Sequence, residues 1–159
     1  MEATIKLLKK AIAGELMASS FYSQASEITK NDEARMVFLN LSTSEDDHAQ
    51  SLVNKFNEVF GTADFDSQAY LDELIKLDYG VDVEGSNTIK NGTPQEVLKL
   101  AISLENTAKK TYDQMADEAI NPELKKYCLE LSAEESQHAK ELSNVLNSLD
   151  MDMEDRPAL

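Results

Sequence analysis

The sequence predicts an all-α protein, a four-helix bundle built from two helical hairpins. Four long segments place apolar residues at helical spacing, and the second half of the chain repeats the first at an offset of 90 residues. The composition agrees, since the 159 residues include five Gly, three Pro and no Trp, and 42% are hydrophobic, enough for one domain with a core. We expect that domain to span residues 1–150, followed by a frayed acidic tail at 151–159.

The first two helices are expected over residues 4–28 and 32–60. They form the first hairpin because only a few residues join them. Gly61 is a suitable stop for the second helix. The stretch 61–92 is long enough to cross the length of a bundle, so the third helix can lie parallel to the second. Within this crossover we expect one short helix, around residues 70–77, and then a Gly/Asn-rich run.

The second hairpin follows this crossover. The third helix is expected to begin at the sequence TPQE, where Thr93 is the N-cap and Glu96 completes a capping box. It runs to residue 120. The fourth helix begins at NPE, with Asn121 as its N-cap, and runs to residue 149. The short join between these two helices predicts a second antiparallel hairpin.

The repeat that relates residue n to residue n+90 covers both hairpins, and it preserves polar as well as apolar positions. The shared polar pairs include Glu15 and Glu105, Tyr22 and Tyr112, Asn31 and Asn121, Ser42 and Ser132, Glu45 and Glu135, and His48 and His138. These pairs include both histidines of the chain. The repeat therefore predicts a shared chemical site in addition to shared packing.

Four glutamates and both histidines lie on the apolar faces of the expected helices. Glu45 and His48, for example, follow Leu41 at steps of four and three residues. Burying four carboxylates costs several kcal/mol each unless positive charge balances them, and the same faces carry no Lys or Arg. Two divalent cations balance this charge, and two neutral imidazoles complete their coordination. The predicted metal ligands are Glu15, Glu45, His48, Glu105, Glu135 and His138.

This pattern of Glu, Glu-x-x-His, Glu and Glu-x-x-His in four successive helices resembles the ferritin-like di-iron carboxylate proteins. Tyr22 and Tyr112, each seven residues after a single glutamate, and the long middle connection are similar to the rubrerythrin branch of that superfamily. The resemblance covers residues 4–149. It implies two iron ions bridged by Glu45 and Glu135, and a reaction with hydrogen peroxide or dioxygen, or ferrous oxidation. We expect the tyrosines to hydrogen-bond to ligand carboxylates.

Two features depart from rubrerythrin. A rubredoxin domain needs four cysteines, whereas this chain has one, Cys128. The resemblance therefore implies that electrons come from another protein, such as a rubredoxin. Rubrerythrin also carries a redox-dependent glutamate ligand three residues after the third-helix glutamate, and that position is Ala108 here. This predicts slow peroxide cycling and a ligand set closer to bacterioferritin-like centres.

The charge balance bears on partners and location. Thirty acidic and fifteen basic residues give a net charge of −15, which disfavours binding to nucleic acid and to anionic membranes. One cysteine excludes an internal disulfide framework. The N-terminal segment mixes charges among its apolar residues, unlike a signal peptide or a membrane span. We therefore expect a cytoplasmic protein, and we favour a homodimer.

Two other functions use parts of the same pattern. A ferritin-like storage protein oxidises and sequesters iron with the same six ligands, but it needs a hollow shell of many copies. A structural helical module without metal would carry the buried glutamates incidentally. Glu and His ligands also accept manganese or zinc in place of iron. Exchange of helices between two chains through residues 61–92 would preserve every ligand.

Overall fold

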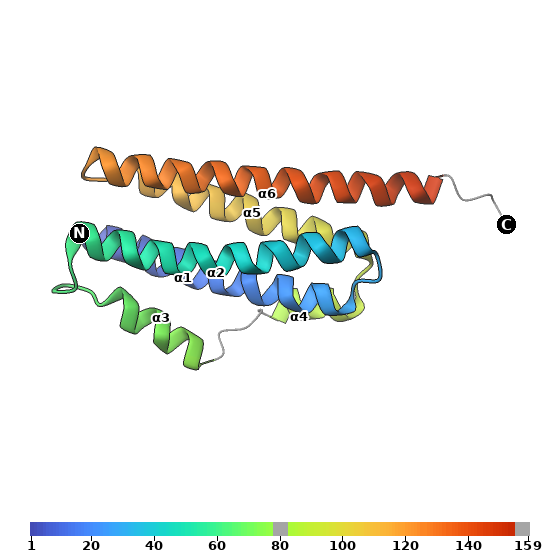
Figure 1. Cartoon of the computed structure of the whole chain (residues 1–159), viewed down its shortest axis with the longest axis horizontal. Helices are drawn as coiled ribbons and strands as arrows, with labels where there is room; N and C mark the ends of the chain where they lie inside the picture. The colour runs from blue at the N-terminus through green and yellow to red at the C-terminus, as the bar shows by residue number, and fades with distance from the viewer. Residues whose placement is uncertain (78–82, 155–159) are drawn as a thin grey trace.

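The computed structural model describes residues 1–77 and 83–154, and the described residues form six helices and no strand. The helices are α1 (Glu2–Ile28), α2 (Asp32–Phe60), α3 (Ser67–Lys76), α4 (Val83–Asn91), α5 (Pro94–Asp117) and α6 (Pro122–Glu154). Helices α1, α2, α5 and α6 form the bundle, and α3 and α4 belong to the crossover (Figure 1). The expected all-α four-helix bundle is confirmed.

The two hairpins, α1–α2 and α5–α6, lie side by side. Helix α1 packs on α2 and α5, while α6 packs on α5 and α2. Helices α2 and α5 run in the same direction in Figure 1, as the length of the crossover predicted. Packing is closer within each hairpin than between the two. The seam between the hairpins is therefore where polar side chains find room inside the bundle.

The predicted helix boundaries rest on side-chain caps that the structure contains. Asn31 and Asn121 each accept a hydrogen bond from the backbone N–H three residues later. Thr93 and Glu96 form the reciprocal capping box. Gly61 ends α2 with a φ of 70°, a left-handed value that glycine adopts without a Cβ clash. Local chemistry thus sets these four boundaries.

Several other expected boundaries are wrong. Helix α1 starts at Glu2 instead of residue 4, and α5 ends at Asp117 instead of residue 120. The early end of α5 leaves room for Asn121 to adopt its capping role before the next helix. Helix α6 continues past residue 149 to Glu154, because no Gly or Pro interrupts it. The first part of the acidic tail is therefore helical, and residues 155–159 lie outside the described part of the chain.

The crossover contains two helices where one was expected. Helix α3 begins at Ser67 rather than near residue 70, with Asp66 as its N-cap. Helix α4 was not predicted, because its segment includes Gly and Asn residues that favour loops. Its Ile89 is only 5% exposed and packs into the bundle core, and this burial outweighs the weak local propensity. Residues 78–82 lie outside the described part.

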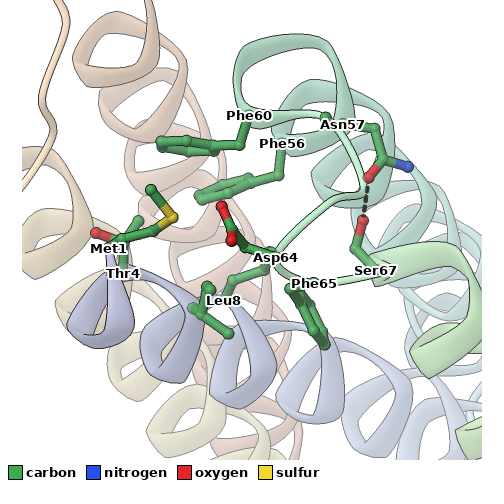
Figure 2. Close-up of a pocket in the computed structure, with 11 residues that line it drawn as sticks. Met1, Thr4, Leu8, Phe56, Asn57, Phe60, Asp64, Phe65 and Ser67 are labelled. Atoms are coloured by element: carbon green, nitrogen blue, oxygen red, sulfur yellow. Dashed lines mark hydrogen bonds between the residues drawn. The ribbon is translucent and has the colours of Figure 1, made fainter.

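Figure 2 shows the end of the bundle where the crossover leaves α2. Ser67 Oγ donates a hydrogen bond of 2.7 Å to Asn57 Oδ1, which ties the start of α3 to α2. The rings of Phe56 and Phe60 lie beside this connection, with centroids 5.6 Å apart. The crevice among these side chains has a volume of only about 20 Å³, which suits a single water molecule. This crevice is too small for a solute much larger than water.

The apolar core is divided into two clusters, one toward each end of the bundle. The first cluster includes Leu8, Ile12, Leu52, Phe56 and Leu131. The second includes Phe21, Phe38, Leu41, Leu98 and Leu142. Along every bundle helix the repeated glutamates and histidines fall between residues of the two clusters. Among the described residues, no helix is both long enough and apolar enough to span a membrane.

Candidate metal centre

The six side chains predicted as metal ligands meet in the middle of the bundle, between the two apolar clusters. Helix α1 contributes Glu15, α2 contributes Glu45 and His48, α5 contributes Glu105, and α6 contributes Glu135 and His138. The four glutamates are at most 2% exposed. The carboxylates therefore face the interior of the bundle, as their helical spacing predicted. The structure brings all six residues together.

These side chains form two overlapping groups, each with ligand atoms that lie within 4.8 Å of one another. The first group, which we call the His48 position, comprises Glu15, Glu45, His48 and Glu135. The second group, the His138 position, comprises Glu45, Glu105, Glu135 and His138. Glu45 and Glu135 belong to both groups. The two groups of possible metal ligands therefore overlap through two shared carboxylates.

At the His48 position, the imidazole points its Nδ1 atom at three carboxylates. Nδ1 of His48 lies 2.9 Å from Glu135 Oε1, 3.1 Å from Glu45 Oε2 and 3.7 Å from Glu15 Oε2. One of these carboxylates comes from the same helix and one comes from the other hairpin. An ion among these atoms would take the place of the Nδ1 proton.

The His138 position repeats this geometry. Nδ1 of His138 lies 3.1 Å from Glu135 Oε2, 3.2 Å from Glu45 Oε1 and 3.5 Å from Glu105 Oε2. The two imidazole rings are stacked, with centroids 5.7 Å apart and planes 15° from parallel. The sequence repeat is thus also an approximate two-fold symmetry of the side chains at the centre.

The two tyrosines of the repeat link the hairpins. The hydroxyl of Tyr22 on α1 donates a hydrogen bond to Glu105 on α5, and the hydroxyl of Tyr112 on α5 donates one to Glu15 on α1. Both tyrosines are fully buried. Burial, followed by the charge of the acceptor carboxylate, raises the pKa of each phenol well above its usual value. The phenols therefore remain protonated donors.

The buried carboxylates have more acceptor atoms than the protein supplies with donors. Glu15 Oε2, Glu135 Oε1, both oxygens of Glu45 and His48 Nδ1 are buried, and although the oxygens lie near a histidine nitrogen, none of these atoms forms a hydrogen bond. Each such atom costs about 1–3 kcal/mol, and more if the group is charged. Within residues 1–77 and 83–154, no lysine or arginine forms a salt bridge with the four glutamates. Oxygen and imidazole donors suit iron, manganese and zinc, so this cluster can bind metal ions.

The pKa values of the carboxyl groups reflect the same burial. Desolvation raises the pKa of Glu45 and raises that of Glu135 to about 7. Burial acts in the same direction on Glu105, but its interactions with His138, Glu135 and Tyr22 outweigh burial and lower its pKa. Burial thus opposes ionisation of Glu45 and Glu135, and the neighbouring His138 and His48 act on their pKa values in the other direction.

The histidines respond in the opposite sense. Burial alone would lower the pKa of each imidazolium, but the carboxylates of Glu135, beside His48, and Glu105, beside His138, outweigh it. The pKa of His138 rises to about 12, and that of His48 is also raised far above its usual value. The neighbouring carboxylates thus favour the protonated form of both imidazoles, and a cation that bound at Nδ1 would displace a proton.

Comparison with known protein families agrees with this geometry. Residues 5–152 match the family model described as Ferritin-like domain. The chain belongs to this family. No curated protein and no solved structure matches the chain. The ferritin-like part of the resemblance is therefore confirmed, while the rubrerythrin branch stays a prediction.

A hollow of about 310 Å³ between α1 and α5 of this ferritin-like protein reaches the centre. Three predicted ligands, Glu15, Glu45 and Glu105, line it. The remaining lining is mostly small, with Ala11, Ala13, Gly14, Ala18, Thr107, Ala108 and Thr111. One water molecule occupies roughly 30 Å³ in the liquid, so the hollow accommodates a small solute beside the carboxylates. Ala108, where rubrerythrin carries its additional glutamate, faces this space.

The sequence analysis missed the residues that contact the outer nitrogens of the two histidines. His48 Nε2 lies 2.8 Å from Glu134 Oε2, and His138 Nε2 lies 3.3 Å from Ser44 Oγ. Positions 44 and 134 are related by the offset of 90, and each directly precedes a ligand glutamate. Their different residue types removed them from the set of repeated polar pairs. Their position, adjacent to the Glu-x-x-His motifs, was the signal that could have identified them.

Proposed function

We propose that this ferritin-like protein is a non-haem di-iron oxidoreductase of the rubrerythrin kind, which reacts with hydrogen peroxide or dioxygen. The observation that carries this proposal is the pair of overlapping ligand groups that share Glu45 and Glu135. A mononuclear site needs no shared carboxylates, and a purely structural core gains nothing from four buried glutamates, three of which have oxygens without a hydrogen-bond partner. We propose two iron ions, with manganese or zinc as alternatives.

In this proposal each ion has ligands from both hairpins. Glu15 and His48 would hold one ion, Glu105 and His138 would hold the other, and the carboxylates of Glu45 and Glu135 would be shared by both positions. When bound, two ferrous ions supply the two electrons that, with two protons, reduce one hydrogen peroxide to two water molecules. The protein supplies the ligand charge, the orientation of the carboxylates and the approach of the oxidant.

The chain's own residues fit these tasks. Tyr22 and Tyr112 hold one oxygen of Glu105 and Glu15, respectively. The other oxygen of Glu15 is without a hydrogen-bond partner, and that of Glu105 lies 3.5 Å from His138 Nδ1. The apolar clusters on either side limit water near the carboxylates and strengthen electrostatic interactions there. The hollow between α1 and α5 gives a small oxidant a route to the centre. This route favours a reactive centre over a buried structural one.

We further propose that electrons reach the centre from a separate donor protein such as a rubredoxin. A rubredoxin-type iron site needs four cysteines, and these 159 residues contain one, the buried Cys128. The proposed assembly is a homodimer. The alternative function is storage of iron in a shell of many copies, because the same six ligands would bind iron there.

Three measurements test the proposal. Metal analysis of the purified protein is expected to give two ions per chain, predominantly iron. After anaerobic loading with ferrous iron, one hydrogen peroxide is expected to oxidise two ferrous ions. Light scattering is expected to give the mass of a dimer, whereas a mass of many chains would favour storage. A loaded protein that leaves peroxide and dioxygen unchanged would contradict the oxidoreductase proposal.

A further inference from the structure

The two metal positions have equivalent inner side chains, but their histidines have different outer partners. Nε2 of His48 contacts the carboxylate of Glu134 at 2.8 Å, whereas Nε2 of His138 contacts the hydroxyl of Ser44 at 3.3 Å. The approximate symmetry that relates all the inner residues also relates these two outer positions. The two ligand groups thus match in residue type, but the outer partner of the histidine is a carboxylate in one and a hydroxyl in the other.

The two partners affect the imidazoles differently. An ionised carboxylate can only accept a hydrogen bond, so Glu134 requires the proton on Nε2 of His48 and leaves the Nδ1 lone pair for an ion. A carboxylate acceptor also makes the imidazole a better electron donor. The hydroxyl of Ser44 can donate or accept, and its contact with His138 is longer, so it enforces neither effect strongly. The negative charge of Glu134 further favours a cation nearby.

We infer that the two positions are unequal, and that the His48 position binds a divalent cation more tightly than the His138 position because Glu134 supports its histidine. This inference rests on the proposed metal centre and assigns Glu134 as a positioning residue that acts through His48. The consequence is an ordered loading of the two positions, with the ion at His48 held first and released last.

The expected size follows from the exposure of Glu134. Changing a partner of this kind typically alters metal affinity by 10–100-fold. The Glu134 side chain is 57% exposed, so solvent weakens its effect. We therefore expect a difference of roughly tenfold, near the lower end of that range. If the two positions are treated as independent and one ion is bound per chain, a tenfold difference in affinity gives an occupancy ratio of about three to one, which is the square root of ten.

The experiment uses the full chain freed of metal, crystallised after addition of one cobalt(II) per chain. Anomalous diffraction at the cobalt edge then gives the occupancy of each position. The unaltered chain is expected to hold about three times more cobalt at the His48 position. Glu134→Gln keeps the size of the side chain but removes its charge, and we expect nearly equal occupancies. The double variant Ser44→Glu/Glu134→Ser is expected to reverse the preference.

A matched control is available one turn earlier on the same helix. Glu130 is also 57% exposed and lies 3.7 Å from Lys126, away from the centre. Glu130→Gln makes the same change in net charge, so it is expected to leave the occupancy ratio unchanged. A general effect of charge or helix stability would instead alter the ratio in both glutamine variants.

The outcomes separate this inference from the proposed function. Two bound cobalt ions at equal occupancy in the unaltered chain would overturn the inference and leave the metal centre standing. A preference for the His48 position that persists in Glu134→Gln would also overturn the inference. This single substitution lies on an exposed side chain, so the test remains possible even if the double variant does not fold. A chain that binds no cobalt at all would contradict the metal centre, and the inference with it.

Discussion

The two hairpins carry the same residues toward the centre of the bundle, but different contacts hold the two helices of each hairpin together. Each contributes one single glutamate, one tyrosine and one Glu-x-x-His pair to the centre. Between their own helices the contacts differ. Ser42 Oγ donates to the backbone oxygen of Ser19 at 3.0 Å in the first hairpin, whereas Ser132 Oγ donates to the Asp113 carboxylate at 2.5 Å in the second.

Contacts between the hairpins, unlike these contacts within each hairpin, join residues that the repeat keeps the same. Tyr22 of the first hairpin binds Glu105 of the second, and Tyr112 binds Glu15 in return. A change at one of these positions therefore affects the other hairpin, and neither hairpin completes the centre alone. The serine and aspartate contacts lie within one hairpin and can diverge independently. The crossover adds to the difference, because α3 packs on α1 and α2, and α4 packs on α1 and α5.

The strongest test of this shared dependence is the loss of a bridging glutamate. Glu45→Ala and Glu135→Ala each remove a carboxylate from both ligand groups, so either variant is expected to lose both metal ions. Glu15→Ala and Glu105→Ala affect one group each and are expected to retain about one ion per chain. Metal content by mass spectrometry measures the result. Retention of one ion by the Glu45 variant would show that this residue does not bridge.

Removal of metal should be the next largest effect. A bound ion stabilises the folded state by about 2.7 kcal/mol at a free concentration of 100 Kd. Chelation is therefore expected to lower the thermal midpoint by roughly 5–10 °C for a chain of this length. Differential scanning calorimetry with and without chelator measures the shift. Glu135→Ala, which is expected to lack metal already, is the control and should not respond. An unchanged midpoint in the unaltered chain would contradict metal-linked stability.

Both tests concern residues that the sequence alone predicted to share one site. This prediction was possible because it rests on local helical periodicity. Glu45 and His48 belong to the apolar stripe of one helix, so their inward direction follows from helix geometry before any tertiary contact is known. The repeat then supplied the second Glu-x-x-His pair, and caps such as Asn31 supplied the ends of helices.

Features that depend on tertiary packing could not be predicted in this way. Helix α4 forms because Ile89 reaches the core, which the Gly/Asn-rich sequence does not reveal. The hollow beside Ala108 depends on how closely α1 and α5 approach, and a row of small residues alone does not fix that distance. The contact of Glu134 with His48 crosses from one hairpin to the other and breaks the repeat, so the repeat could not indicate it.

The hollow provides a third test of the comparison. Ala108→Glu places a carboxylate beside the centre from the second hairpin, where a further anionic ligand would stabilise the oxidised state. We expect peroxide turnover, measured with an excess of external reductase and rubredoxin, to rise by roughly tenfold. Ala108→Gln fills the same space without charge and should not accelerate turnover. Fast turnover by the unaltered chain would show that this additional ligand is dispensable.

The repeat supplies a counterpart on the first hairpin. Ala18 also lines the hollow and follows Glu15 by three residues, as Ala108 follows Glu105. If the hairpins are equivalent on this side, Ala18→Glu is expected to accelerate peroxide turnover to a similar extent. Acceleration by the substitution at residue 108 alone would show that the approximate symmetry does not extend to the approach of the oxidant.

Smaller effects are expected from the tyrosines. Tyr22→Phe and Tyr112→Phe each remove a buried hydrogen bond to a carboxylate, which typically contributes about 1.5–3 kcal/mol when one partner is charged. Both variants should keep two ions per chain, because the ligand atoms remain, while their rate of reaction with peroxide changes. Stopped-flow kinetics and metal analysis measure the two quantities. Loss of metal in either variant would contradict the role of these tyrosines as supports of the ligand carboxylates.

The smallest expected difference concerns the contacts that diverged within the hairpins. Ser132→Ala removes a hydrogen bond to an ionised aspartate and is expected to cost about 1 kcal/mol, against about 0.5 kcal/mol for Ser42→Ala, whose acceptor is a neutral backbone oxygen. Urea denaturation at neutral pH measures both free energies of unfolding. Equal losses would show that the charge of Asp113 adds nothing to this contact.

The difference in unfolding free energy between Ser132→Ala and Ser42→Ala should depend on pH. Lys109, and then Ser132, lower the pKa of Asp113 below its usual value. A carboxyl group with a lowered pKa in the folded state stabilises the protein above its unfolded pKa, and this stabilisation is lost as the pH falls through the lowered folded value. The extra cost of Ser132→Ala should therefore shrink as the pH falls from about 4, where Asp113 of the unfolded chain takes up a proton, through the lower pKa of the folded state. The cost of Ser42→Ala involves no titrating partner and should stay constant over the same range, so parallel changes in both variants would contradict this account of how the second hairpin is held.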